Sequence, residues 1–304
     1  MEDNQFFVSV RADCEATAHA VKNPALGERS VRGLLDVLKR EGLKGTLYVI
    51  PTDLEASAGL YREAGAQGCE IGLHVHPADL GAEEFLGVLG PDGQRAVLAQ
   101  ARDRFAAAMG RAPESLCIGY HSANDYTFPL LVELGFRHGT NSTPTRNLPE
   151  CASVWAGAPL DAHYAHPWNR LLPGWLDFVE LPSTLDPDSR MWGGKHPQDL
   201  RVELVDAKNH WYTIAKAVDR QLREATPVKR IEISTHNIFD FSDPRDFRRE
   251  TLEKMIAHMK RILSDRGCTL IPATAETTAA AFRAACPLPA PGAGRLKLDT
   301  RGRA

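Results

Sequence analysis

The stretch of the chain that decides the fold is residues 69–77, which read Cys69-Glu70-Ile71-Gly72-Leu73-His74-Val75-His76-Pro77. Its apolar residues predict a buried strand that ends in two histidines one residue apart. Because residues two positions apart on a strand point to the same face, His74 and His76 can direct both imidazoles toward one point. Imidazole binds zinc, copper, iron and nickel. Two alternate histidines on a strand are nevertheless more often ordinary polar residues. Whether this pair binds a metal therefore depends on the rest of the chain.

The segments around this stretch alternate between strand and helix patterns. Strands are predicted at 6–10, 46–50, 69–77, 116–120, 136–140, 178–181, 230–237 and 268–271. Helices are predicted at 30–41, 54–66, 94–109, 127–134, 198–225, 248–265 and 275–285. Alternating strands and helices imply parallel pairing with right-handed crossovers, and seven or eight such units favour a barrel over an open sheet.

Two stretches have no regular pattern, residues 141–175 and 182–197. A loop of such length is usually functional or poorly ordered, and an insertion without a role is the alternative. From Pro287 onward the chain is rich in proline and glycine and then basic, which predicts a flexible, dispensable tail over residues 287–304. Residues 1–286 are therefore expected to form one barrel domain.

Composition excludes several classes of function. Charged residues make up 25% of the chain and the formal net charge is −3, so no nucleic acid or anionic membrane is expected as a partner. No apolar run approaches the roughly 18 residues of a membrane span. The polar start of the chain lacks the pattern of a signal peptide, so we expect a cytoplasmic protein with six free thiols. The oligomeric state stays open.

Several polar residues are predicted at the carboxyl ends of strands, where the active site of a barrel gathers. They are Asp13, His74, His76, His121 and His236. Their convergence is the main evidence, from the residues alone, for a metal site.

The order of the motifs resembles the polysaccharide deacetylase family, which is carbohydrate esterase family four. After the strand that ends in Asp13, the similar blocks are Gly45 to Ile50, Glu70 to Pro77, Ile118 to His121, Ser234 to Asn237 and Gly267 to Glu276. The resemblance runs from about Phe6 to Phe282. It implies an α/β fold, a distorted (β/α)7-type barrel in a single domain.

The resemblance also implies a reaction, the metal-dependent hydrolysis of an N-acyl group, most often N-acetyl, from an amino sugar. The implied metal ligands are Asp13, His74 and His76, and zinc is the first expectation for the divalent cation. Three protein ligands leave a position open for water or a carbonyl oxygen. His236 falls on the family's histidine that protonates the leaving amine, an acid that amide cleavage needs.

The chain departs from the family pattern at three places. One residue separates the two metal histidines where three are commoner. Arg11 stands where the catalytic-base aspartate is expected, and an arginine stays protonated and cannot act as a base. His121 stands where the arginine partner of that base is expected. Among nearby carboxylates, Glu15 is preferred over Asp125 as the base, since alternation places it on the side of Asp13.

The predicted substrate contacts are Arg11, Tyr120, His121 and Asn124. Arg11 is assigned to an anionic group of the substrate, since a guanidinium suits bidentate contact with a phosphate or carboxylate. The expected substrate is accordingly a soluble amino sugar or a sugar-containing biosynthetic intermediate. Tryptophans gather in the irregular regions, where they either stack on sugar rings or cover the barrel mouth; they are Trp155, Trp168, Trp175 and Trp192.

Two alternatives to this enzyme remain open. The first is another metallohydrolase, because a His-x-His pair also opens the metal site of amidohydrolase and phosphoesterase barrels. In those barrels the pair usually lies on the first strand, whereas here it lies on the third. The second is an inactive barrel that binds a sugar or a metal without turnover, a reading that Arg11 keeps open.

Overall fold

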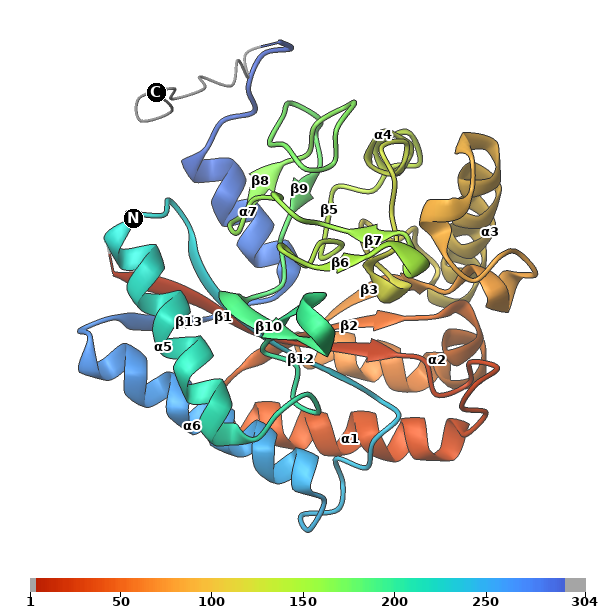
Figure 1. The fold of residues 1–304 in the computed structure, drawn as a ribbon. Coiled ribbons are helices and arrows are strands. Elements are labelled where there is room, and N and C mark those ends of the chain that lie inside the picture. Colours follow the sequence, from red (N-terminus) through yellow and green to blue (C-terminus); the bar gives the residue numbers. More distant parts are fainter. Residues whose placement is uncertain (1–3, 293–304) are drawn as a thin grey trace.

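A curled sheet of mostly parallel strands forms the centre of the fold, with helices packed around it (Figure 1). The structure is a computed structural model that describes residues 4–292. Its strands follow the order β12-β1-β2-β3-β4-β5-β9-β8, and β13 also pairs with β1. Only β8 and β9 pair antiparallel among these neighbours. The predicted barrel-type α/β fold is confirmed, with the sheet curled into a half-barrel.

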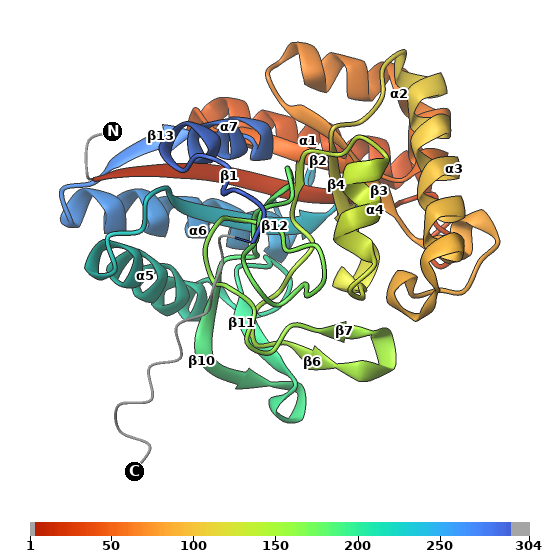
Figure 2. The same cartoon turned by 90° about the horizontal axis from the view of Figure 1, so that it is seen from above.

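The elements have the following bounds. The strands of the main sheet are β1 (Gln5–Cys14), β2 (Lys44–Val49), β3 (Glu70–Val75), β4 (Ser115–Ile118), β5 (His138–Gly139), β8 (His163–Tyr164), β9 (Val179–Glu180), β12 (Lys229–His236) and β13 (Thr269–Pro272). The α-helices are α1 (Pro24–Glu41), α2 (Pro51–Ala66), α3 (Pro91–Met109), α4 (Thr127–Glu133), α5 (Ala207–Arg223), α6 (Phe247–Asp265) and α7 (Ala275–Ala285). Two hairpins, β6 (Asn147–Leu148) with β7 (Ser153–Val154) and β10 (Leu185–Met191) with β11 (His196–Asp199), lie together on one side of the sheet (Figures 1 and 2).

Helix α1 shows how local sequence sets the element ends. The side chain of Asn23 accepts a hydrogen bond from the backbone N–H of Leu26, and Pro24 occupies the first turn, where its missing N–H costs nothing. Gly42 ends the helix in the left-handed region at φ 66°, which glycine adopts without strain. The predicted end of this helix at Gly42 is therefore confirmed, whereas its start lies earlier than residue 30.

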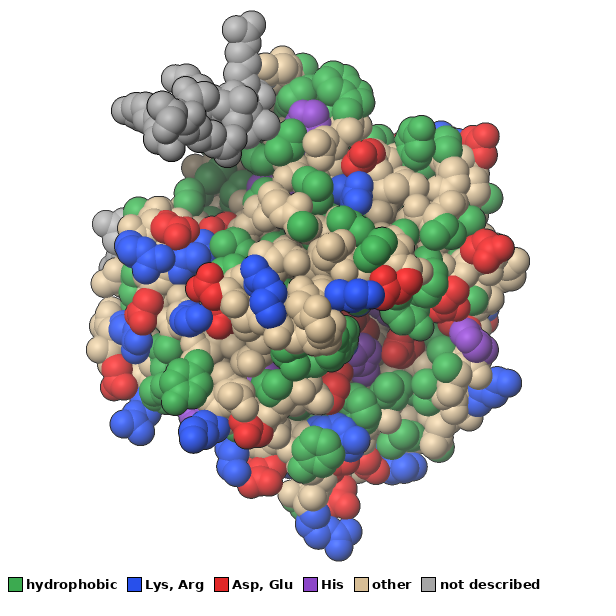
Figure 3. All heavy atoms as spheres, in the orientation of Figure 1, with side chains coloured by type: hydrophobic (Ala, Val, Ile, Leu, Met, Phe, Trp, Pro, Cys, Tyr) green, Lys and Arg blue, Asp and Glu red, His purple; other side chains and the backbone are tan. Residues whose placement is uncertain are grey.

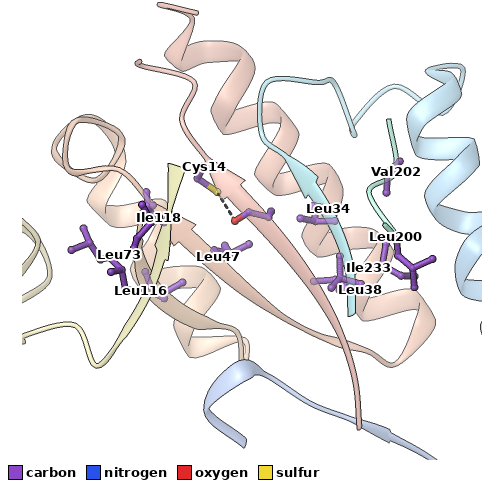
Figure 4. Close-up of a cluster of buried hydrophobic side chains, with 14 of the residues drawn as sticks. Cys14, Leu34, Leu38, Leu47, Leu73, Leu116, Ile118, Leu200, Val202 and Ile233 are labelled. Carbon is purple, nitrogen blue, oxygen red and sulfur yellow. Dashed lines mark hydrogen bonds between the residues drawn. The ribbon is translucent and has the colours of Figure 1, made fainter. Parts of the chain in front are cut away.

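The apolar face of α1 packs against the strands. Leu34 and Leu38 are buried in one cluster with Leu47 of β2 and Ile233 of β12 (Figure 4). Truncating one such buried leucine to alanine costs about 2–5 kcal/mol in comparable cores. This packing holds β12, β1 and β2 in place, and with them the polar groups at their carboxyl ends.

The structure corrects three expectations in the irregular half of the chain. The helix predicted over 198–225 begins only at Ala207, after Asp206 caps it by accepting from the N–H of Asn209. Residues 198–206 instead belong to β11 and to a segment that bridges to β12. The stretches 141–175 and 182–197 contain the two hairpins and β8. These strands are short or polar, so periodicity could not reveal them.

Other features bear on the sequence predictions. No helix within residues 4–292 is long and apolar enough to cross a membrane. The six cysteines are all free. Of the predicted tail, residues 287–292 follow α7 and are exposed, while 293–304 lie outside the described residues. The division into a barrel domain and a tail stays a prediction.

Candidate metal centre and active-site cavity

Three side chains of types that bind metals, Glu15, His74 and His76, meet at the carboxyl ends of β1 and β3. Nε2 of His76 lies 2.8 Å from Oε2 of Glu15, and Nε2 of His74 lies 3.5 Å from the same oxygen. One ligand atom from each of the three residues lies within 4.8 Å of the other two. Burial opposes ionisation of Glu15, yet the hydrogen bonds to both histidines outweigh it and hold the pKa of this carboxyl far below its usual range.

The second nitrogen of each imidazole is held by a neighbouring oxygen. Nδ1 of His74 lies 2.8 Å from the carbonyl oxygen of Cys117, and Nδ1 of His76 lies 3.3 Å from Oε1 of Glu84. Such partners orient metal-binding histidines and leave Nε2 free to bind. One carboxylate and two imidazoles also match the ligands that zinc accepts. These residues therefore fit a divalent cation.

Asp13 belongs to a different environment. Its Oδ2 lies 3.6 Å from a guanidinium nitrogen of Arg11, and Nε of Arg11 lies 3.8 Å from Glu232. Asp13, His74 and Cys117 form a second possible metal group, but Arg11 lies 3.3 Å from the sulfur of Cys117. Because the guanidinium charge repels a cation there, the group that contains Glu15 is the better candidate.

The three predicted metal ligands therefore do not all lie in one cluster. His74 and His76 lie together, but in the described part of the chain the carboxylate grouped with both of them belongs to Glu15. Asp13 is grouped with His74 and Cys117 and not with His76. Arg11 is only 3% exposed and faces two carboxylates. Oδ1 of Asp13 is buried and has no hydrogen-bond partner among residues 4–292.

His236 lies at the end of β12, directly opposite Asp13 in the pairing of β12 with β1. Its Nδ1 lies 2.5 Å from Oε1 of Glu203. Burial lowers the pKa of His236, but the charge and hydrogen bond of Glu203 outweigh this effect and raise the pKa to about 9. His236 is therefore a cation at neutral pH. Sequence reasoning missed Glu203, because residues 198–206 were assigned to a helix.

The pair of His236 and Glu203 predicts a pH dependence of stability. A raised histidine pKa stabilises the folded protein fully below the ordinary pKa of 6.5, and this contribution is lost as pH rises through about 9. In metal-free protein, the difference in unfolding free energy between wild type and Glu203→Gln should therefore shrink between about pH 7 and pH 10, by about 1–3 kcal/mol. Urea unfolding at several pH values measures it. A difference that stays constant with pH contradicts the assignment.

A strained loop after β4 supports one wall of the site. In the 3-10 helix η3 (Gly119–His121), Tyr120 and His121 both have positive φ, 57° and 53°. Such backbone in non-glycine residues costs energy and persists where the surroundings enforce it. The Tyr120 ring lies edge-on to His76, with centroids 5.2 Å apart. Burial, with the charges of Arg11 and Arg146, keeps the pKa of His121 well below its usual range, so His121 is neutral.

Gly119 is required by the position of the His76 ring. A Cβ atom at Gly119 would lie 2.6 Å from Cε1 of His76, so Gly119→Ala has to displace the ring. We expect zinc affinity, measured by competitive titration, to fall by about tenfold or more, the scale of disturbed histidine orientation. Gly59→Ala is the control, because a Cβ there meets no atom within 4 Å. Equal zinc affinities of the two variants would argue against a His76 ligand.

These groups line one cavity of about 150 Å³, which contains every predicted site residue except Asn124. Figure 3 shows histidine atoms beside acidic side chains in a hollow near the centre of this face. The structure places Asn124 elsewhere: its side-chain amide donates to the carbonyls of Gly87 and Leu89 and accepts from Gln94. The side chain of Asn124 therefore joins backbone segments outside the cavity lining, and its contact with a substrate stays a prediction. Asp125, the other candidate base, pairs with Arg170 outside the cavity.

The cavity also contains residues that the sequence analysis did not single out. They are Arg146, Asp199 and Arg201, from the irregular half of the chain. The tryptophans do not line it: Trp155 is fully buried, and Trp168 packs against Trp175 with centroids 5.4 Å apart.

Comparison with known proteins finds one family model and several solved structures that are similar to this chain. A model of the polysaccharide deacetylase family matches residues 22–139, which include both clustered histidines. A putative polysaccharide deacetylase from Mycobacterium smegmatis is 16% identical, with TM-score 0.62 over 98% of this chain and 96% of that one. A probable polysaccharide deacetylase from Pseudomonas aeruginosa PAO1 is 15% identical, with TM-score 0.63 over 94% of each chain. Puue allantoinase is 14% identical, with TM-score 0.64 over 94% of this chain and 93% of that one.

At these identities the solved structures establish the fold alone, and among curated proteins none matches this sequence. The curled parallel sheet, with a polar cavity at its strand ends, defines a deacetylase-type α/β barrel. Residues 22–139 match the polysaccharide deacetylase family, as the resemblance of the motifs predicted, and the solved structures share the fold of the chain.

Proposed function

We propose that the protein is a metal-dependent hydrolase that removes an N-acyl group, N-acetyl first, from a soluble amino sugar or a sugar-containing biosynthetic intermediate. One observation carries the proposal: a cluster that could hold a metal ion, Glu15, His74 and His76, shares a cavity with Asp13 and His236. Hydrolysis of an amide needs an electrophilic activator, a base for water and an acid for the nitrogen. This cavity contains candidates for all three.

Glu15, His74 and His76 would hold the cation, for which zinc suits the ligand chemistry. When bound, such a cation polarises a carbonyl oxygen and lowers the pKa of water. Glu84 and the Cys117 carbonyl keep both imidazoles turned toward Glu15.

In this proposal Asp13 is the general base. Asp13 lines the cavity, and its buried Oδ1 has no hydrogen-bond partner among the described residues, so this oxygen is the proposed acceptor of a proton from water. Arg11 pairs with the other oxygen and favours the ionised carboxylate. The roles expected from the resemblance, with Asp13 as ligand and Glu15 as base, are thereby exchanged. Arg11 then positions the base, which replaces its expected contact with the substrate.

His236 is the proposed acid for the departing amine. Glu203 holds its Nδ1, so Nε2 is the nitrogen left to donate. Tyr120 and His121 line the cavity and are the proposed substrate contacts.

The test combines elemental analysis with acetate release from a panel of N-acetyl amino sugars. We expect bound zinc and acetate release that disappears on chelation and returns with zinc. Allantoin belongs in the panel because the allantoinase of the comparison carries that activity in its name. Hydrolysis of allantoin or of phosphoesters in place of N-acetyl sugars would establish a different hydrolase. Bound metal without hydrolysis of any compound would establish the inactive, ligand-binding barrel.

A further inference from the structure

Two arginines in the cavity, Arg146 and Arg201, have only one carboxylate among the lining residues, Asp199, left to balance their charges. Arg146 is only 7% exposed, and Arg201 is half-buried beside it in the same cavity. The Nε atoms of both are buried without a hydrogen-bond partner, and neither guanidinium lies within 4 Å of a carboxylate among residues 4–292. A buried cation with unpaired N–H groups is costly, and proteins usually retain one where a ligand completes it.

The charges of the cavity show that these two arginines are in excess. The lining contains three arginines and three carboxylates. Arg11 pairs with Asp13, and Glu15 lies against the two histidines. Asp199 alone remains for Arg146 and Arg201, and it already accepts from the backbone N–H of Arg201 and lies 3.5 Å from His196. A cation held by Glu15 adds further positive charge.

Both arginines are held by well-anchored backbone. The N–H of Arg146 donates to the carbonyl of Thr143, and its carbonyl accepts from the N–H of buried Trp155. The indole of Trp155 donates to the carbonyl of His121, which fixes Arg146 relative to the site. Arg201 bridges to Ser234 of β12, two residues before His236. The backbone of both arginines is therefore fixed before a ligand binds, which lowers the entropic cost of binding.

We propose that Arg146 and Arg201 form a subsite for an oxyanion group of the substrate, a phosphate or a carboxylate. Guanidinium groups bind both anions through paired, charge-assisted hydrogen bonds. The assignment rests on the proposed function only for the rest of the substrate, which is an N-acyl amino sugar that carries this anion. Burial, together with the charge of Arg201, lowers the pKa of Arg146 to about 10, which still leaves it charged at neutral pH.

Sulfate is the probe for the subsite, because its binding can be measured without turnover. Calorimetric titration of zinc-loaded protein, with chloride at equal ionic strength as reference, should show saturable sulfate binding. Arg146→Gln and Arg201→Gln should each weaken it by about tenfold or more, the scale of one charge-assisted contact. Arg104→Gln is the charge-matched control, because Arg104 pairs with Glu55 outside the cavity, and it should bind as wild type does.

Arg146→Lys, which keeps the charge of a buried residue, guards against a folding defect in Arg146→Gln and should bind sulfate more tightly than that variant. No saturable binding to the wild type, or unchanged binding to both glutamine variants, overturns the subsite.

A kinetic experiment identifies the anion and tests the anion subsite separately from the proposed hydrolase function. The substrates are one N-acetyl amino sugar in neutral, phosphorylated and carboxylated forms. We expect kcat/KM to be highest for one anionic form, and both glutamine variants should lose about tenfold more activity on that form than on the neutral form. Sulfate binding without hydrolysis of any form retains the subsite and removes the proposed function. Hydrolysis without preference for an anionic form retains the proposed function and removes the subsite.

Discussion

Glu15→Gln should leave the purified protein with little bound zinc, whereas Asp13→Asn should retain the zinc of the wild type. The carboxylate of Glu15 lies 2.8 Å and 3.5 Å from the Nε2 atoms of His76 and His74. The amide that replaces it has the same shape but no negative charge, and zinc favours the charged oxygen. Asp13 faces Arg11, which already supplies its positive partner. Elemental analysis and competitive zinc titration measure the result.

Two further variants make the zinc experiment decisive. Glu84→Gln changes the partner of the His76 ring and should weaken zinc binding by about 10–100-fold, the usual cost of losing such a partner. Glu133→Gln is a control on the surface, where Glu133 pairs with Arg95. Loss of zinc from Asp13→Asn with retention by Glu15→Gln would restore the ligand set expected from the resemblance and refute the exchange of roles.

Asp13→Asn and His236→Gln should each lower kcat by about 10²-fold or more while zinc stays bound, the usual scale of general acid–base help. Asp13 presents an oxygen without a hydrogen-bond partner among the described residues, and His236 is kept charged by Glu203. Removing the base slows attack by water, and removing the acid leaves a poor leaving group. Initial rates of acetate release with the best N-acetyl substrate, at matched zinc content, measure both effects.

The pH dependence of the rate distinguishes an acid role of His236 from a purely structural role, because a purely structural role would not change the shape of the profile. In the wild type, rate should fall at high pH as His236 loses its proton, and His236→Gln should lack this alkaline limb. His258→Gln is the matched control, because His258 lies on α6 against Trp211, outside the cavity. Full activity of Asp13→Asn would show that another group accepts the proton, with Glu15 the first to test.

Much of the fold follows from local sequence. Apolar strands alternating with amphipathic helices predicted the parallel sheet, and every predicted strand is present. The period of two along β3 also predicted that His74 and His76 converge, and they do so on one oxygen. The family resemblance rests on the same local motifs, and the family match over residues 22–139 covers part of them.

The identity of the grouped carboxylate depended on tertiary structure. Alternation placed Asp13 and Glu15 on one side, but β1 ends at Cys14, so the period of two does not extend to Glu15. There the backbone N–H of Glu15 donates to Oδ1 of Asn237, 2.7 Å away, which fixes the turn that carries Glu15 to the histidines. Asp13 meanwhile stays on the strand beside Arg11.

No local sequence pattern predicted the residues on the other side of the cavity. Glu203, Arg146 and Arg201 lie in irregular segments, where no periodicity relates a side chain to a face. Long-range contacts place them: Arg201 through its bridge to Ser234, and Arg146 through its backbone bond with Trp155. Repeating patterns report which face of an element is buried, so the sequence predicts strands, helices and the histidine pair. Partners from distant segments become neighbours only when the chain folds, so the proposed ligand set and the proposed anion subsite required the tertiary structure.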